Sequence, residues 1–212
     1  TLRFINNFDG LTVTIPHKSA VVKLCDSLYP EAETTQAVNW MKFDKNRNLI
    51  GNNFDGKGFI NGFLNQSLTF NHKIVCLFGA GGAAVAIGCS LANEGIKELK
   101  IVNRNINKAN ELKKRINIIN KNLKVSVFVS YDYNITDCDI IINATSLGLK
   151  KKDKMPFDVT KSLSNCIIAD IIMQPKETEL LKKAKSIGRP IHYGKYMIES
   201  QIDLVGDFLN LW

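Results

Sequence analysis

The sequence predicts a two-domain α/β protein in which one domain is a doubly wound parallel sheet. From about Lys73 onward, short apolar runs alternate with segments of helical length, as strands and helices do in such a sheet. Residues 1–70 lack this alternation, so we expect them to form a second unit that joins the first between Asp55 and Asn65. With 212 residues, 45% of them hydrophobic, the chain can bury two small cores that share a crevice.

The N-terminal unit begins with a short predicted strand. Residues 11–14 alternate between apolar and polar side chains, and Pro16 ends the run just before Lys18. A helix is predicted around residues 20–28, and a turn at residues 44–48. Polar side chains end the apolar segments of this unit, namely Thr14, Lys18, Asn39 and Asp55.

The second unit carries the alternating pattern. Residues 73–79 are a continuous apolar run that ends in glycine, which is typical of a strand buried on both faces. Further strands are predicted at residues 98–103, 125–129, 139–144, 166–172 and 189–193, and helices at 83–95, 108–120, 177–187 and 196–211. We expect the last helix to return to the first unit, so that residues 1–55 plus 194–212 form one domain and residues 56–193 the other.

A glycine-rich turn follows the first strand of the second unit and opens a helix. Gly79, Gly81 and Ala84 occupy the three small positions of a G-x-G-x-x-A motif. Gly79 permits the tight turn, Gly81 lets the backbone approach a pyrophosphate, and Ala84 lets helix and strand pack closely. The free N–H groups of the helix N-terminus then hold the phosphates. Between a strand and a helix the motif predicts a Rossmann dinucleotide site. A glycine-rich turn that binds no ligand would have a similar sequence.

The end of the next strand indicates which dinucleotide binds. An NAD site usually has an acidic residue there to hold the ribose hydroxyls. This chain has Asn103 and Arg104 instead, with Lys108 nearby and no acid. Because a guanidinium can bind a 2′-phosphate through two charge-assisted hydrogen bonds, we expect the cofactor to be NADP.

Two pairs of polar residues each allow a functional and a structural interpretation. Asn143 and Thr145 follow an apolar strand, at the edge where ligands lie in such sheets. A turn that is rich in Asn, Thr and Ser but binds no ligand would have the same sequence pattern. A lysine beside an aspartate can pass a proton to a substrate hydroxyl. The residues cannot place Lys18 beside Asp55, and a solvated lysine with a turn-forming aspartate fits equally well.

Composition narrows the class of protein. The formal charge is +8, but the lysines are spread along the chain, without the aromatic–basic platform of a nucleic-acid binder, so we expect no nucleic-acid partner. The five cysteines form no C-x-x-C pair and no zinc spacing with the three histidines, so we expect reduced thiols, no metal site and a cytoplasmic protein. No apolar run reaches membrane-spanning length, and we expect no membrane association.

Seven motifs occur in the order found in shikimate dehydrogenases, and the chain resembles that family over essentially its whole length. They are GLTVTIPHK, AVN, GNNFDGKGF, GAGGAA, VNRN, NATSLG and GKYMIESQ. The resemblance implies NADP-dependent interconversion of 3-dehydroshikimate and shikimate by a monomer or homodimer. Lys18 then matches the catalytic lysine, Asp55 its paired aspartate, and Thr14, Asn39 and Gln201 the residues that hold the substrate hydroxyls.

The same resemblance extends to the cofactor. It places Gly79, Ala80, Gly81, Gly82 and Ala83 in the phosphate loop, and Asn103, Arg104 and Lys108 at the adenosine phosphate. It also places Gly194 near the nicotinamide. We assign Asn143 and Thr145 to the cofactor site as well.

The chain departs from the family pattern at several positions. Gln36 and Trp40 flank the AVN motif where the family has Gly and Thr, Phe54 replaces Thr in NTDG, and Met173 replaces a tyrosine. Nothing before Gly10 resembles the family's serine pair that grips the substrate carboxylate. We therefore expect an N-terminally incomplete substrate domain that lacks strands from the middle of its sheet and binds shikimate weakly. A quinate dehydrogenase and a non-catalytic NADP-binding homologue are the alternatives.

Overall fold

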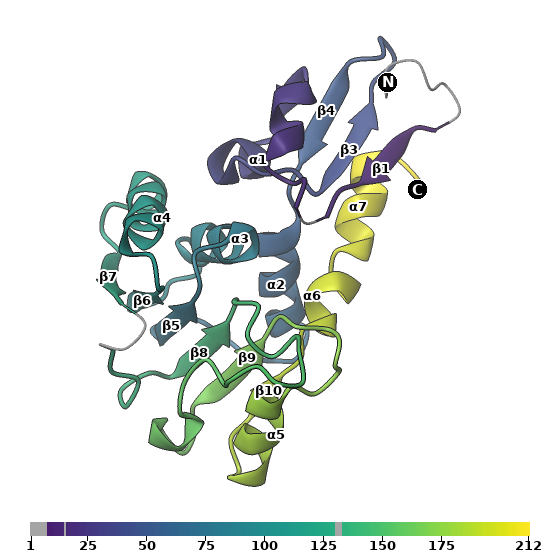
Figure 1. The fold of residues 1–212 in the computed structure, drawn as a ribbon. Helices are drawn as coiled ribbons and strands as arrows, with labels where there is room; N and C mark the ends of the chain where they lie inside the picture. Colours follow the sequence, from purple (N-terminus) through teal and green to yellow (C-terminus); the bar gives the residue numbers. More distant parts are fainter. Residues whose placement is uncertain (1–7, 15, 130–132) are drawn as a thin grey trace.

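The computed structural model describes residues 8–14, 16–129 and 133–212, and within them the chain forms two sheets (Figure 1). The smaller sheet has the order β1-β3-β4-β2. Its strands are β1 (Gly10–Thr12), β2 (Ser27–Leu28), β3 (Trp40–Phe43) and β4 (Leu49–Asn52). Strand β3 pairs antiparallel with β1 and β4, and β2 pairs parallel with β4. The expectation of a gap in the middle of this sheet is wrong, because these four strands pair without interruption.

The larger sheet confirms the predicted doubly wound architecture. Its six described strands are all parallel, in the order β10-β9-β8-β5-β6-β7. They are β5 (Ile74–Phe78), β6 (Glu98–Val102), β7 (Lys124–Phe128), β8 (Ile140–Asn143), β9 (Ile167–Asp170) and β10 (Ile191–His192). Helices α3 (Gly82–Leu91), α4 (Ile106–Ile119) and α5 (Glu179–Ser186) connect them. The strand order reverses between β5 and β8, and ligands bind outside the carboxyl ends of the strands at such a point.

Helix α2 (Asp55–Leu64) joins the two sheets (Figure 1). The sequence predicts only a junction here, whereas the structure shows a largely buried helix packed between α3 and α6 (Lys195–Glu199). Gly56, Gly58 and Gly62 permit this packing, because a Cβ atom at any of them would lie 2.3 to 2.7 Å from a backbone oxygen of a neighbouring helix. Glycine lowers intrinsic helix propensity, and here close tertiary packing outweighs that cost.

The C-terminal segment returns to the small sheet. Val205 and Phe208 of α7 (Ile202–Leu209) pack against Phe54, with Trp40 beside them. The prediction of one continuous helix over residues 196–211 is wrong, because the helix is interrupted at Ser200 and Gln201, which separate α6 from α7. The break gives Gln201 a position at the start of α7, facing the small sheet.

Two other local predictions need correction. Residues 20–28 form a 3₁₀ helix over Ala20–Leu24 and then strand β2, because Ser27 and Leu28 pair with β4. Helix α1 (Pro30–Thr35) follows, with proline at its first turn. All five cysteines carry free thiols, four of them buried and Cys25 half-buried. Among the described residues, no helix has the length and apolarity needed to cross a bilayer.

His192 is a buried polar residue at the end of β10. Its ring lies 5.6 Å from the ring of Phe59, 5.1 Å from that of Phe63 and 5.1 Å from that of Tyr196, measured between centroids. Neither ring nitrogen has a hydrogen-bond partner among the described residues. Burial therefore lowers the pKa of His192 from 6.5 to about 4.

This histidine should make stability depend on pH. Between about pH 6.5 and pH 4 the unfolded chain binds a proton at residue 192 that the folded chain does not, so the free energy of unfolding falls as the pH falls. The loss should reach about 3 kcal/mol at the acid end of this range. The variant His192→Phe should flatten the corresponding part of the curve in urea unfolding measured across this range. Equal slopes for the two proteins would contradict the assignment.

Candidate active site

Side chains from both ends of the chain line one cavity of about 500 Å³ beside α2. One wall is polar and the other is apolar. The polar residues are Thr12, Thr14, Lys18, Asn39, Asp55 and Gln201, and the apolar wall includes Trp40, Ile198, Ile202, Leu211 and Trp212. The five residues predicted for catalysis and substrate binding therefore share one cavity.

Lys18 and Asp55 form an ion pair in this cavity. The Lys18 Nζ atom lies 2.6 Å from Asp55 Oδ2, and their side chains are 19% and 3% exposed. The strand-ending turn aims the lysine, because His17 N donates to Thr14 O and Val38 N donates to Lys18 O, which ties the turn to the segment before β3. Asp55 is the first residue of α2, where a negative charge is favourable. The geometry rules out the reading of Lys18 as a freely solvated lysine.

Asn39 connects this ion pair to the C-terminal segment. Its Nδ2 atom donates to Asp55 Oδ1 at 2.9 Å and to Gln201 Oε1 at 3.3 Å, while its Oδ1 atom accepts from Phe54 N at 2.9 Å. Gln201 Nε2 is buried and has no hydrogen-bond partner among the described residues. Because buried donors are almost always paired, this amide is a ready donor to a ligand oxygen in the cavity.

Sequence reasoning missed three supporting residues. Thr12 donates to the backbone oxygen of Asn39, and the Asn53 side chain accepts from Asp55 N at 3.0 Å. A Cβ atom at Gly58 would lie 2.5 Å from Gln201 Cγ, so only glycine leaves room for the glutamine. The spacing of glycines in "DGKGFING" was the available signal of a closely packed helix.

The glycine-rich turn lies at the carboxyl end of β5, next to the reversal of strand order. Gly79 has φ +115°, and a Cβ atom there would lie 2.7 Å from Ala144 O, so this position requires glycine. Ala84 is fully buried, as its packing role predicts. In contrast, Cβ atoms at Gly81 and Gly82 would meet no protein atom within 4 Å. The N-terminal turn of α3, which includes Ala83, thus faces open space, and no side chain of the described residues caps it.

The residues predicted to bind the adenosine phosphate follow β6. Arg104 and Lys108 are exposed, and neither side chain has a hydrogen-bond or ion-pair partner among the described residues. Asn103 donates to Asn105 O at 2.8 Å, and the Asn105 side chain caps α4 by accepting from Lys108 N. The cap places Lys108 in the first turn of α4, four residues after Arg104. Two unpaired cations therefore stand at the edge where a nucleotide phosphate would lie.

The residues predicted for the cofactor site near the ends of β8 and β9 have structural contacts of their own. Asn143 is fully buried, accepts from Thr145 N and Oγ1, and donates to Leu147 O. Its side chain shapes the loop after β8. Gly194 packs against the end of β9, where a Cβ atom would lie 2.5 Å from Ile171 O. Asp170, which sequence reasoning missed, accepts there from Ile172 N and Thr178 Oγ1.

Burial shifts the acidity of Asp170. The carboxyl group is fully buried at the end of β9, and burial raises its pKa in spite of the hydrogen bonds that it accepts. This group links the ends of β8 and β9, because it contacts Asn143 as well as Ile172 and Thr178. Asp170 thereby joins the residues that follow β9 to Thr178, which precedes α5.

Comparisons with known proteins agree with this geometry. Residues 64–179 match the family model described as shikimate/quinate 5-dehydrogenase, and residues 2–41 match the shikimate dehydrogenase substrate-binding domain. A shikimate dehydrogenase (NADP(+)) of Geobacillus sp. strain WCH70 is 39% identical over 91% of this chain and 69% of its own length.

Solved structures give the same result. A crystal structure of a shikimate dehydrogenase in complex with NADP+ is 31% identical, superposes with a TM-score of 0.87, and covers 95% of this chain and 71% of its own. Quinate dehydrogenase from Corynebacterium glutamicum in complex with NAD has a TM-score of 0.86 at 29% identity, with coverage of 95% and 73%. The sequence matches show that this chain belongs to the shikimate/quinate dehydrogenase family.

Proposed function

We propose that this protein is an NADP-dependent shikimate dehydrogenase that interconverts 3-dehydroshikimate and shikimate. The observation that supports this most directly is the hydrogen-bonded set of Lys18, Asp55, Asn39 and Gln201, which joins both ends of the chain in one cavity. The curated relatives that match over most of the chain carry this activity in their names.

Each polar residue of the cavity has a separate role in the proposed oxidation of the substrate alcohol. The N-terminal turn of α3 would hold NADP, which would supply the acceptor for the hydride of the carbon that bears the hydroxyl. Lys18 exchanges the hydroxyl proton, taking it up in oxidation and returning it in reduction. Asp55 keeps the lysine side chain oriented through the 2.6 Å contact. Gln201 Nε2, Asn39 and Thr14 hold the remaining substrate oxygens.

The test is a spectrophotometric assay of NADPH formation with shikimate as substrate. We expect NADP-dependent turnover of shikimate that exceeds turnover of quinate. Faster turnover of quinate would make the chain a quinate dehydrogenase. No turnover with either acid, together with normal NADP binding, would support a non-catalytic homologue instead.

Cofactor choice can be tested at Arg104. We expect Arg104→Ala to weaken NADP binding by about 1.5–3 kcal/mol, the range for hydrogen bonds to a charged group. NAD lacks the 2′-phosphate, so its affinity should stay nearly unchanged and serves as the internal control. Calorimetric titration of both cofactors measures the difference. Equal losses for NADP and NAD would defeat the assignment of Arg104 to the 2′-phosphate.

We also place the protein in the cytoplasm, as a monomer or a homodimer. The support for the compartment is the set of five free thiols, since disulfides are rare in cytosolic proteins. Sedimentation analysis of the purified protein distinguishes the two assembly states.

A further inference from the structure

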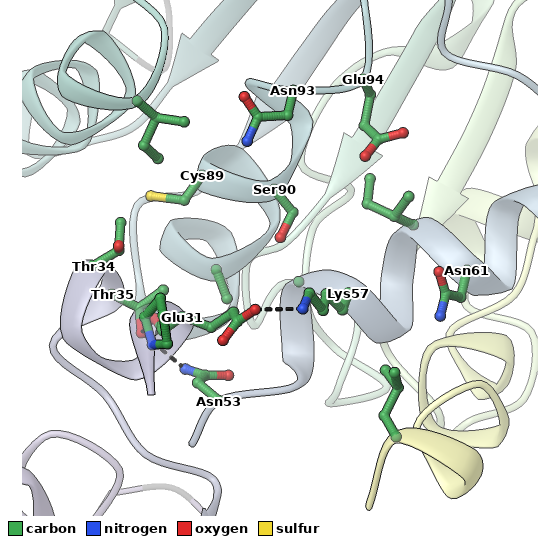
Figure 2. Close-up of a pocket in the computed structure, with 16 residues that line it drawn as sticks. Glu31, Thr34, Thr35, Asn53, Lys57, Asn61, Cys89, Ser90, Asn93 and Glu94 are labelled. Atoms are coloured by element: carbon green, nitrogen blue, oxygen red, sulfur yellow. Dashed lines mark hydrogen bonds and ion pairs between the residues drawn. The ribbon is translucent and has the colours of Figure 1, made fainter. Parts of the chain in front are cut away.

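A second cavity, of about 520 Å³, lies on the other side of α2 (Figure 2). Its walls come from α1 and Asn53 on the side of the small sheet, and from α3 and Ile119 on the side of the parallel sheet. Successive residues of α2 separate the two cavities, because Asp55 faces the active site whereas Gly56 and Lys57 line the second cavity. The two cavities share no lining residue among those described.

The second cavity is also separate from the predicted phosphate loop. The loop lies at the N-terminus of α3, but the cavity is lined by Ala86, Cys89 and Ser90 of that helix and by the residues after it. Ser90, which lines the cavity, lies about 12 Å along the helix axis from Gly82. The closely packed crossing of α2 and α3 at Gly56 stands between the two sites. The cavity therefore belongs neither to the substrate site nor to the cofactor site.

The charges that line this cavity do not balance. Glu31 and Lys57 form an ion pair across it, as Figure 2 shows, so the lysine charge is already neutralised. The Glu94 side chain has no hydrogen-bond or ion-pair partner among the described residues, and the residue is partly buried. Burial raises the pKa of Glu94, and no neighbouring cation offsets the effect. One carboxylate thus stands in the cavity without an opposite charge.

Neutral polar groups face the same space. The side chains of Asn61, Ser90 and Asn93 line the cavity without a hydrogen-bond partner among the described residues (Figure 2). Ile60 and Leu204 add apolar wall. Small-molecule sites have this composition, with a few convergent polar groups on a partly apolar lining, and they commonly lie between domains in cavities of this size.

We infer that this cavity is a second ligand site, and that its ligand is a small polyhydroxylated molecule that carries a protonated amine. The ammonium group would pair with Glu94 in a charge-assisted hydrogen bond. Ligand hydroxyl groups would exchange hydrogen bonds with the amides of Asn61 and Asn93 and with the hydroxyl of Ser90. The hydrocarbon part of the ligand would lie on Ile60 and Leu204. The inference does not depend on the activity proposed for the other cavity.

Calorimetric titration of the full chain with D-glucosamine near neutral pH tests the inference, with N-acetyl-D-glucosamine and D-glucose as matched probes that lack the positive charge. We expect saturable binding of glucosamine that is at least about tenfold tighter than that of either neutral sugar, the scale of one hydrogen bond to a charged group. Equal affinities for the three sugars, or no saturable binding of glucosamine, would overturn it.

Variants then locate the binding. Glu94→Gln keeps the shape of the side chain and should weaken glucosamine binding about tenfold or more. Glu179→Gln, on the exposed face of α5, removes the same charge elsewhere and should change nothing. Asn93→Trp starts from an exposed residue after α3 and should abolish binding by filling the cavity.

A titration with NADP shows that each variant is folded. If Glu94→Gln does not fold, Asn93→Trp decides the question. Unchanged glucosamine affinity in a folded Glu94→Gln or Asn93→Trp variant would refute the site.

Discussion

Lys18→Ala should lower the kcat of shikimate oxidation by at least about 100-fold, which is the usual scale of acid–base assistance. The variant removes the group that exchanges the hydroxyl proton and leaves Asp55 in the cavity without its 2.6 Å partner. NADP binding should survive, because the predicted cofactor residues follow β5 and β6 on the other sheet. Steady-state kinetics and a separate NADP titration measure the two effects.

The matched control is Lys23→Ala. Lys23 is exposed on the short 3₁₀ helix that follows the turn and does not line the cavity, so its loss should leave kcat unchanged. Near-normal kcat in Lys18→Ala would show that the ion pair is structural and that another group exchanges the proton.

Gly81→Val should weaken NADP binding by at least about 100-fold without destabilising the fold. Gly81 has φ −85° and ψ −177°, a conformation that any residue adopts, and an added Cβ meets no protein atom. The valine would occupy the space that the pyrophosphate needs. Loss of two charge-assisted hydrogen bonds at about 1.5–3 kcal/mol each accounts for an effect of this size.

Gly79→Ala provides the contrast for Gly81→Val. Its positive φ and the 2.7 Å approach to Ala144 O predict a loss of stability in addition to any loss of binding. Urea unfolding of both variants, together with NADP titration, separates the two roles. A Gly81→Val protein that binds NADP normally would place the pyrophosphate elsewhere.

The cofactor half of the protein could be predicted from the residues themselves. Its buried parallel strands are continuous apolar runs, and the conformation of Gly79 leaves a clear sign in the sequence. Asn143 shows the limit of this reasoning. A polar residue at the end of a strand can bond its own loop, face a ligand, or do both. The structure shows the loop bonds of Asn143, and its place in the cofactor site stays a prediction.

The substrate half depended on resemblance, and the structure explains why. Lys18 and Asp55 are 37 residues apart, and their contact requires the pairing of β1 with β3 and β4 followed by the start of α2. Gln201 reaches Asn39 across 162 residues. Helix α2 could not be predicted from the sequence, because its glycines are typical of a turn. In the structure each of these glycines permits a close contact with a neighbouring helix. Such long-range contacts leave no local pattern in the sequence.

The return of α7 to the small sheet sets an order of events during synthesis on the ribosome. Everything needed for the parallel sheet emerges before Gln201 does, and domains generally fold as units while the chain is being made. The hydrophobic cluster of Phe54 and Trp40 can form only after Val205 and Phe208 have been synthesised. A nascent chain should therefore acquire its nucleotide-binding half first, and gain a complete substrate cavity only when residues 198–212 have left the exit tunnel.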